Sequence, residues 1–164
     1  MAISYSLELV TPLPTAAVAQ EFAEVARSLR LFDPSTTADV LLDDGATTAY
    51  GTWTRVVTRK PTPWGDPLIG GRAFTPTVSV ALRLGKDDDI SGQQDDMVRL
   101  AVALLSRVPG DAVLHLDYED VWLVRLDGAL SLSERADLWP ANRLAEVPAP
   151  YRRESHEFEF PEDD

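Results

Sequence analysis

The chain contains no cysteine among its 164 residues and only two histidines, His115 and His156. The lack of cysteine excludes disulfides and thiolate metal sites, and it is typical of proteins kept in a reducing compartment. No apolar run approaches the roughly twenty residues of a membrane span, and the N-terminus lacks the basic start and apolar core of a signal peptide. These absences predict a cytoplasmic protein with no membrane segment.

Basic residues are also scarce, since 15 lysines and arginines face 27 acidic residues, for a formal net charge of −12. Such a charge repels nucleic acid and anionic membranes and attracts basic partners. We therefore expect neither a nucleic-acid nor a membrane partner. An ordinary solvated acidic surface explains the same charge without any partner.

Signatures of catalytic and metal sites are missing as well. Neither histidine has a second histidine at metal-ligand spacing, and there is no Gly-x-Ser-x-Gly elbow or phosphate-binding glycine loop. His115 is expected at the surface or at a sheet edge. The acids from Asp87 to Asp95 partly follow a calcium-loop register, but its twelfth position is Val98 instead of glutamate. The sequence thus predicts no enzyme, no metal and no cofactor.

The strongest pattern that is present lies between residues 91 and 127. Apolar residues recur there at helical spacing and form one stripe: Met97, Leu100, Ala101, Leu104, Leu105 and Val108. Pro109 and Gly110 end this helix. Two apolar runs follow, 112–118 and 121–126, and their separation by Glu119–Asp120 predicts a hairpin.

The segments before this helix complete a sheet. Alternation over 3–9 predicts a strand with Glu8 on its wet face, and the 15–29 pattern predicts an amphipathic helix. Strands are expected at 47–58 and 77–84. The order predicts an α+β fold of ferredoxin-like βαββαβ type, in which an antiparallel sheet carries two helices on one face and gains one added strand.

We expect a single domain over residues 1–164, with its core in residues 1–128. An irregular C-terminal arm follows at 129–156, with a short helix around 134–139, and the acidic tail at 157–164 is expected to be flexible. The long connection at 59–74 is rich in proline, glycine and cations, and it is either a functional arm or poorly ordered.

Acidic residues gather at turns and helix starts, where side chains are exposed. A surface whose charge resembles a nucleic-acid backbone suits the cationic cleft of a nuclease. Candidate partner-binding residues are the acids Asp87, Asp88, Asp89, Asp95, Asp96, Asp117, Glu119 and Asp120, with Trp64 and Trp122 as exposed aromatics.

Five stretches of the chain resemble one family. They are SYSLELVTPLP at the start, GTWTRV, TVSVALRLGKDDD, the block from Gln93 to Gly128, and SERADLWPANRLAEVPAPYRR. Together they make the chain similar to Sit-type immunity proteins, cytoplasmic antitoxins of contact-delivered swarm-inhibition toxins in myxobacteria, with relatives in actinomycetes. The resemblance implies a non-catalytic protein that neutralises a cognate toxin, or an orphan without one. It assigns no functional residue.

Two other functions fit the same sequence. In one, the chain is a small-molecule-binding ferredoxin-like domain, whose 59–74 loop closes over a ligand while Arg55, Arg59 or Arg72 meets an anionic group. In the other, it is a structural subunit that forms a homodimer through exposed sheet.

Overall fold

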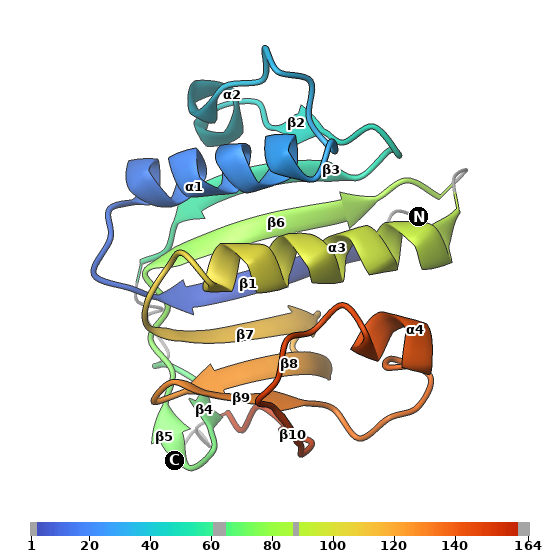
Figure 1. Cartoon of the computed structure of the whole chain (residues 1–164). Helices are drawn as coiled ribbons and strands as arrows, with labels where there is room; N and C mark the ends of the chain where they lie inside the picture. Colours follow the sequence, from blue (N-terminus) through green and yellow to red (C-terminus); the bar gives the residue numbers. More distant parts are fainter. Residues whose placement is uncertain (1–2, 61–64, 87–88, 161–164) are drawn as a thin grey trace.

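The computed structural model describes residues 3–60, 65–86 and 89–160. The fold is mixed α+β: one large, mostly antiparallel sheet carries α1 and α3 on the same face (Figure 1). The sheet strands are β1 (Ile3–Val10), β2 (Ala46–Thr47), β3 (Trp53–Thr58), β6 (Val78–Leu84), β7 (Asp111–Leu116), β8 (Asp120–Leu126), β9 (Ala129–Leu132) and β10 (Arg152–Arg153). The helices are α1 (Thr15–Ser28), α2 (Ala38–Leu42), α3 (Ile90–Leu105) and α4 (Ala141–Leu144).

The strand order is β10-β9-β8-β7-β1-β6-β3-β2, so the first strand of the chain lies near the centre of the sheet. Leu7 of β1 pairs with Val80 of β6 on one side and Leu114 of β7 on the other, both antiparallel. The predicted α+β class is confirmed. With eight strands, however, the sheet is larger than the ferredoxin-like one expected from the sequence, because β2, β9 and β10 extend it.

The apolar stripe of α3 faces the sheet as predicted, since all six of its residues are buried in the main core. The end of the helix is held by Arg125 of β8. Its guanidinium donates hydrogen bonds to the carbonyl oxygens of Leu105, Val108 and Gly110 at 2.6, 2.5 and 2.7 Å. A cation at a helix C-terminus satisfies carbonyl groups that have no partner within the helix. This contact ties α3 to the sheet.

Two tight turns shape the strands that follow α3. The β7–β8 turn passes through Asp117 and Tyr118, with φ of 51° and 61°, two residues earlier than the pair predicted to form it. Asp127 and Gly128, with φ of 51° and 81°, form the next turn. No strand was predicted after it. Positive φ at both central residues is the geometry of a two-residue hairpin, so the chain folds straight back into β9.

The C-terminal arm differs from the prediction in its helix. Residues 134–139 are not helical, and α4 begins only after Pro140, because proline fits best at the start of a helix. Trp139 is buried, and its Nε1 donates a hydrogen bond to the carbonyl oxygen of Trp122 at 2.9 Å. Trp139 therefore anchors the C-terminal arm to β8.

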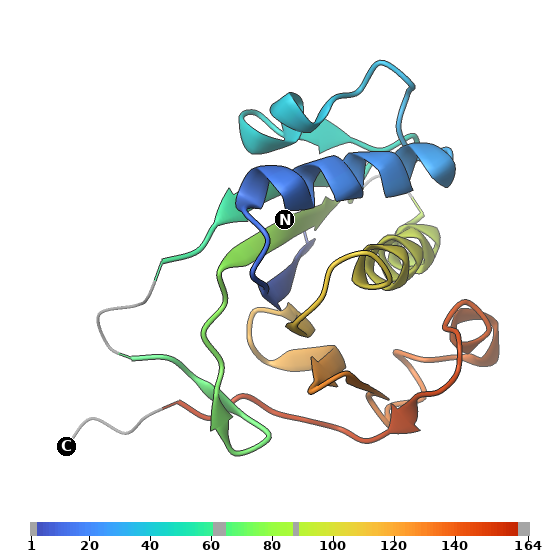
Figure 2. The ribbon, with the colours of Figure 1, turned by 60° about the vertical axis from the view of Figure 1, so that its left-hand side comes forward.

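The sheet face away from α1 and α3 carries a second apolar cluster. A short hairpin of β4 (Leu68–Ile69) and β5 (Arg72–Ala73) meets the C-terminal segment there, and Leu68 pairs with Glu159 (Figure 2). The buried cluster consists of Ile69, Phe74, Val113, Val121, Val124 and Phe158. Part of the connection at 59–74 thus covers β7 and β8, the sheet surface that a dimer built on exposed sheet would need.

Candidate functional site

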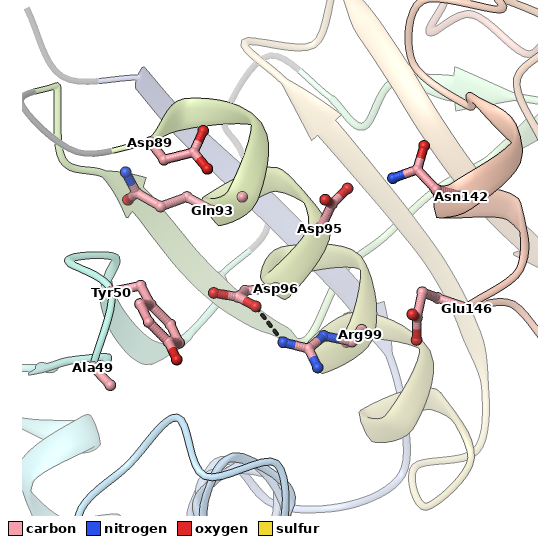
Figure 3. A pocket seen from close by; sticks show the side chains of 10 residues that line it. Ala49, Tyr50, Asp89, Gln93, Asp95, Asp96, Arg99, Asn142 and Glu146 are labelled. Atoms are coloured by element: carbon pink, nitrogen blue, oxygen red, sulfur yellow. Dashed lines mark hydrogen bonds and ion pairs between the residues drawn. The ribbon is translucent and has the colours of Figure 1, made fainter.

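A groove with a volume of about 570 Å³ lies beside the N-terminal half of α3. Its walls are the loop before β3, α3 itself and the α4 region (Figure 3). We call it the acidic groove, because carboxylates dominate its lining of Ala49, Tyr50, Asp89, Gly92, Gln93, Asp95, Asp96, Arg99, Asn142 and Glu146. Three of the predicted partner-binding acids, Asp89, Asp95 and Asp96, meet in this groove.

Gln93 fixes the loop wall. Its side chain is buried, bonds both backbone groups of Gly85, and accepts a hydrogen bond from Thr52 Oγ1 at 2.9 Å. On the other side of the loop, the Ala49 amide donates to the Leu31 carbonyl oxygen at 2.8 Å. Between these anchors Tyr50 stands 62% exposed. A large exposed aromatic side chain on a pinned loop is a typical contact residue of protein interfaces.

Arg143 fixes the opposite wall. It is 3% exposed and donates to Asp95 Oδ1 at 2.7 Å and to the Leu138 carbonyl oxygen at 2.8 Å. Its guanidinium also lies 5.3 Å from the Trp122 ring centre, a cation–π distance. These contacts hold Asn142 and Glu146 opposite α3 (Figure 3).

The four carboxylates of the groove are not equivalent. Asp96 is 6% exposed and forms an ion pair with Arg99, while Asp95 is paired with Arg143. Asp89 and Glu146 form no ion pair with any described residue. Their negative charges therefore remain available to a partner, whereas Asp95 ties α3 to the opposite wall and Asp96 is paired within α3 itself.

A second, smaller cavity of about 150 Å³ lies on the sheet face away from the helices, and we call it the back-face pocket. Glu8 lines it, and His115 lies beside Glu8. Both residues are buried, at 1% and 2% exposure, so the expectations of a wet Glu8 and a surface or edge His115 were wrong. The reason is that Phe74 and Phe158 cover this face.

One comparison identifies the family. A sequence model described as SitI3-like matches residues 3–143. The chain belongs to the SitI3-like family. This is consistent with the resemblance to Sit immunity proteins noted from the sequence. No curated protein and no solved structure matches the chain.

The family match covers most of the acidic groove of this SitI3-like chain. The loop with Tyr50, the whole of α3, and Asn142 and Arg143 lie within it, and Glu146 lies just beyond its end. The same range also contains Glu8 and His115 of the back-face pocket.

The remaining predicted residues do not join the groove of the SitI3-like chain. Asp117 and Glu119 lie in the β7–β8 turn, and Asp120 pairs with Arg135 at 2.7 Å. Trp122 is 1% exposed and packs edge-on against Tyr5 and Trp139, so its assignment as an exposed contact residue was wrong. Trp64, Asp87 and Asp88 lie outside the described residues.

The cations proposed to meet a small ligand are separated. Arg59 lines the back-face pocket, whereas Arg72 pairs with Asp127 at 2.9 Å on the surface. Arg55 lies on β3 and lines neither cavity. Burial lowers the pKa of Arg59, but the Glu8 charge and the contact with Tyr118 outweigh this and raise it overall. Arg59 therefore stays charged beside Glu8.

No group of three or more potential metal-ligand side chains occurs within the described parts of the SitI3-like chain. Its described helices include none long and apolar enough to cross a membrane.

Proposed function

We propose that this SitI3-like chain is an immunity protein that binds a cognate toxin, a nuclease, and blocks its basic active site without any catalytic step. Membership of the SitI3-like family supports an immunity role. The observation that carries the mechanism is the acidic groove, where the free carboxylates of Asp89 and Glu146 lie near exposed Tyr50. Complementary charge speeds association and selects partners, and a nuclease cleft that binds phosphates is cationic.

The acidic groove contains buried residues that hold its shape and exposed residues that can contact a partner, as expected of a binding surface. Gln93 and Arg143 are buried and hold the two walls, so the surface is formed before a partner arrives. A pre-organised surface loses less conformational freedom on binding. Tyr50 supplies the apolar contact, and the free carboxylates supply charge at the rim.

We also infer that the four strands β7, β1, β6 and β3, with α1 and α3, form a ferredoxin-like unit to which the outer strands add. This inference is supported by the antiparallel pairing of β1 with both β6 and β7. The proposal places the protein in the cytoplasm, where a delivered nuclease would reach nucleic acid.

The decisive experiment measures binding to a candidate toxin encoded beside this gene, purified with its active site inactivated. Isothermal titration calorimetry would compare the wild type with the double variant Asp89→Lys/Glu146→Lys. Each reversal turns an attractive rim charge into a repulsive one, so we expect a loss of affinity of roughly tenfold or more.

The matched control is Glu134→Lys/Glu157→Lys, which makes the same change in net charge at two exposed acids outside the groove. If the two double variants lose affinity equally, the groove is not the binding site and only net charge matters. If the toxin binds neither the wild type nor any variant, and the chain fails to protect cells expressing it, the proposal is wrong for that toxin.

A further inference from the structure

The back-face pocket contains a buried carboxylate oxygen without a donor. Oε1 of Glu8 lies 3.5 Å from Arg59 Nη1 and 3.6 Å from His115 Nε2. Oε2 of the same carboxylate has no hydrogen-bond partner among the described residues. Buried charged oxygens are normally satisfied by donors, so the Glu8 carboxylate, which lines this cavity, has capacity left for a donor on a ligand.

His115 Nε2, beside this carboxylate, also has no hydrogen-bond partner among the described residues. The Tyr118 amide donates a hydrogen bond to His115 Nδ1 at 3.0 Å, so a neutral imidazole carries its proton on Nε2. At 3.6 Å from Oε1, that nitrogen is beyond ordinary hydrogen-bond distance, so it does not satisfy the carboxylate. The ring is held between Tyr118 and Phe158, with centroid distances of 4.3 and 5.2 Å, so it cannot turn freely toward the carboxylate.

The charges around the pocket balance. Glu8 and Asp66 contribute two negative charges, and Arg59 and Lys60 contribute two positive ones. Lys60 and Asp66 form no ion pair with another described residue. Lys60 is exposed at the mouth, while Glu8 is buried at the floor. A ligand that spans the pocket therefore meets the Glu8 carboxylate, with Arg59 beside it, inside the pocket and the Lys60 cation at the mouth.

Aromatic and proline side chains form the rest of the lining. Phe74 is buried, Phe160 is 59% exposed, and the Phe160 ring lies 5.9 Å from that of Tyr118. These walls favour an apolar body on the ligand. A volume of about 150 Å³ is below the roughly 300 Å³ at which drug-sized pockets begin, so the ligand is smaller than a typical drug.

We propose that the back-face pocket binds a free amino acid with an apolar side chain. The ammonium group donates to the Glu8 carboxylate, the ligand carboxylate faces Lys60, and the side chain packs against Phe74 and Phe160. Such a zwitterion has no net charge, which matches the balanced lining. This site is separate from the acidic groove and does not depend on toxin binding.

The test titrates the full chain with three probes that carry the same branched apolar group. They are L-leucine, 3-methylbutylamine, which lacks the carboxylate, and 4-methylpentanoate, which lacks the amine. Two-dimensional NMR would report the shifts of Tyr118 and Phe160. We expect leucine to bind most tightly, the amine more weakly, and the acid least of all by roughly tenfold. Tighter binding of the acid, or no shift with leucine at millimolar concentration, would overturn the proposal.

Two variants locate the site. Glu8→Gln removes the negative charge at nearly constant volume, and we expect roughly tenfold weaker binding of leucine. Glu134→Gln makes the same change at an exposed residue outside the pocket and should leave binding unchanged. Equal binding by all three proteins would refute the role of Glu8. If Glu8→Gln does not fold, Phe160→Ala decides: this exposed wall residue should weaken leucine binding, and an unchanged affinity would overturn the proposal.

Discussion

Arg143 Nε donates a hydrogen bond to Asp95 Oδ1 at 2.7 Å, joining residues 48 positions apart in the sequence. The arginine comes from the C-terminal arm and the aspartate from α3, so this pair closes the molecule around Trp122. Within the acidic groove, Asp95 therefore has a structural role. Asp89 and Glu146 form no ion pair with a described residue and are available to a partner.

Replacement of this arginine tests the closure. Arg143→Met should lower the free energy of unfolding by about 2–3 kcal/mol, since the Leu138 carbonyl oxygen and Asp95 lose a charged donor. Urea unfolding followed by tryptophan fluorescence measures the change. Arg152→Met, at an exposed residue, should change stability by less than about 0.5 kcal/mol. Equal effects would show that the buried contacts contribute nothing.

The burial of Trp122 predicts a large effect on the core. Trp122→Ala should cost about 3–5 kcal/mol, because it leaves a cavity between Tyr5 and Trp139. Tyr50→Ala removes an aromatic ring that is 62% exposed, and it should cost no more than about 0.5 kcal/mol. The loss of thermal stability, measured for both variants, distinguishes the buried Trp122 from the exposed Tyr50. A stable Trp122→Ala protein would contradict the burial of this tryptophan.

Gly110 marks a close approach of the backbone. It has φ of 110°, and a Cβ atom there would lie 1.8 Å from the Val10 carbonyl oxygen. Gly110→Ala should therefore cost more than about 4 kcal/mol. Gly71 also has positive φ, at 78°, but it has no atom near a built Cβ, so Gly71→Ala should cost only about 1–2 kcal/mol from backbone strain. If urea unfolding shows similar losses of free energy for Gly110→Ala and Gly71→Ala, the backbone at residue 110 moves easily away from Val10.

The Arg135 guanidinium makes a two-pronged contact with Asp137, at 3.1 and 2.7 Å, and lowers the pKa of that carboxyl group. A carboxyl whose folded pKa is lowered stabilises the fold above its unfolded pKa, and this contribution is lost as pH falls through the folded pKa. Arg135→Gln should return the pKa of Asp137 to its usual range. Carboxyl ¹³C NMR titration measures it, and an unchanged low pKa would exclude the arginine as the cause.

Salt dependence tests the electrostatic part of toxin binding. The affinity for the toxin should fall as ionic strength rises, because exposed charges are screened beyond a Debye length of about 8 Å at 0.15 M salt. Asp89→Asn should make this fall less steep, whereas Tyr50→Ala should weaken binding at every salt concentration. Stopped-flow kinetics separates the two, since rim charges act on association and aromatic contacts on dissociation. Identical salt dependence in the wild type and Asp89→Asn would argue against charge steering by the groove.

The sequence was sufficient for the local elements of the main core. The stripe from Met97 to Val108 identified α3, and alternation identified β1 and β6. These patterns are periodic and local, so they can be recognised in the sequence without knowledge of the fold. The strand β9 was missed because it has only four residues and lies in the segment that was interpreted as an irregular arm.

The back-face pocket was missed for a different reason. Alternation correctly placed Glu8 and His115 opposite the residues that face the helices, but it cannot show whether that opposite face is covered. The cover comes from distant segments around Phe74 and Phe158, which have no periodic pattern. Similarly, nothing near Asp95 in the sequence indicates Arg143 as its partner. Charge clusters located part of the acidic groove, while Tyr50 was not among the predicted residues.

The central position of β1 affects how the protein is made. Leu7 finds its partners only at Val80 and Leu114, so this strand leaves the ribosome long before either neighbour exists. At synthesis rates of about 5–20 residues per second, the wait for the second neighbour is on the order of 5–20 s. During that time an apolar strand has both edges unpaired. Folding of this sheet must therefore wait until the residues around Leu114 have been synthesised, and until then β1 is a segment to which chaperones can bind.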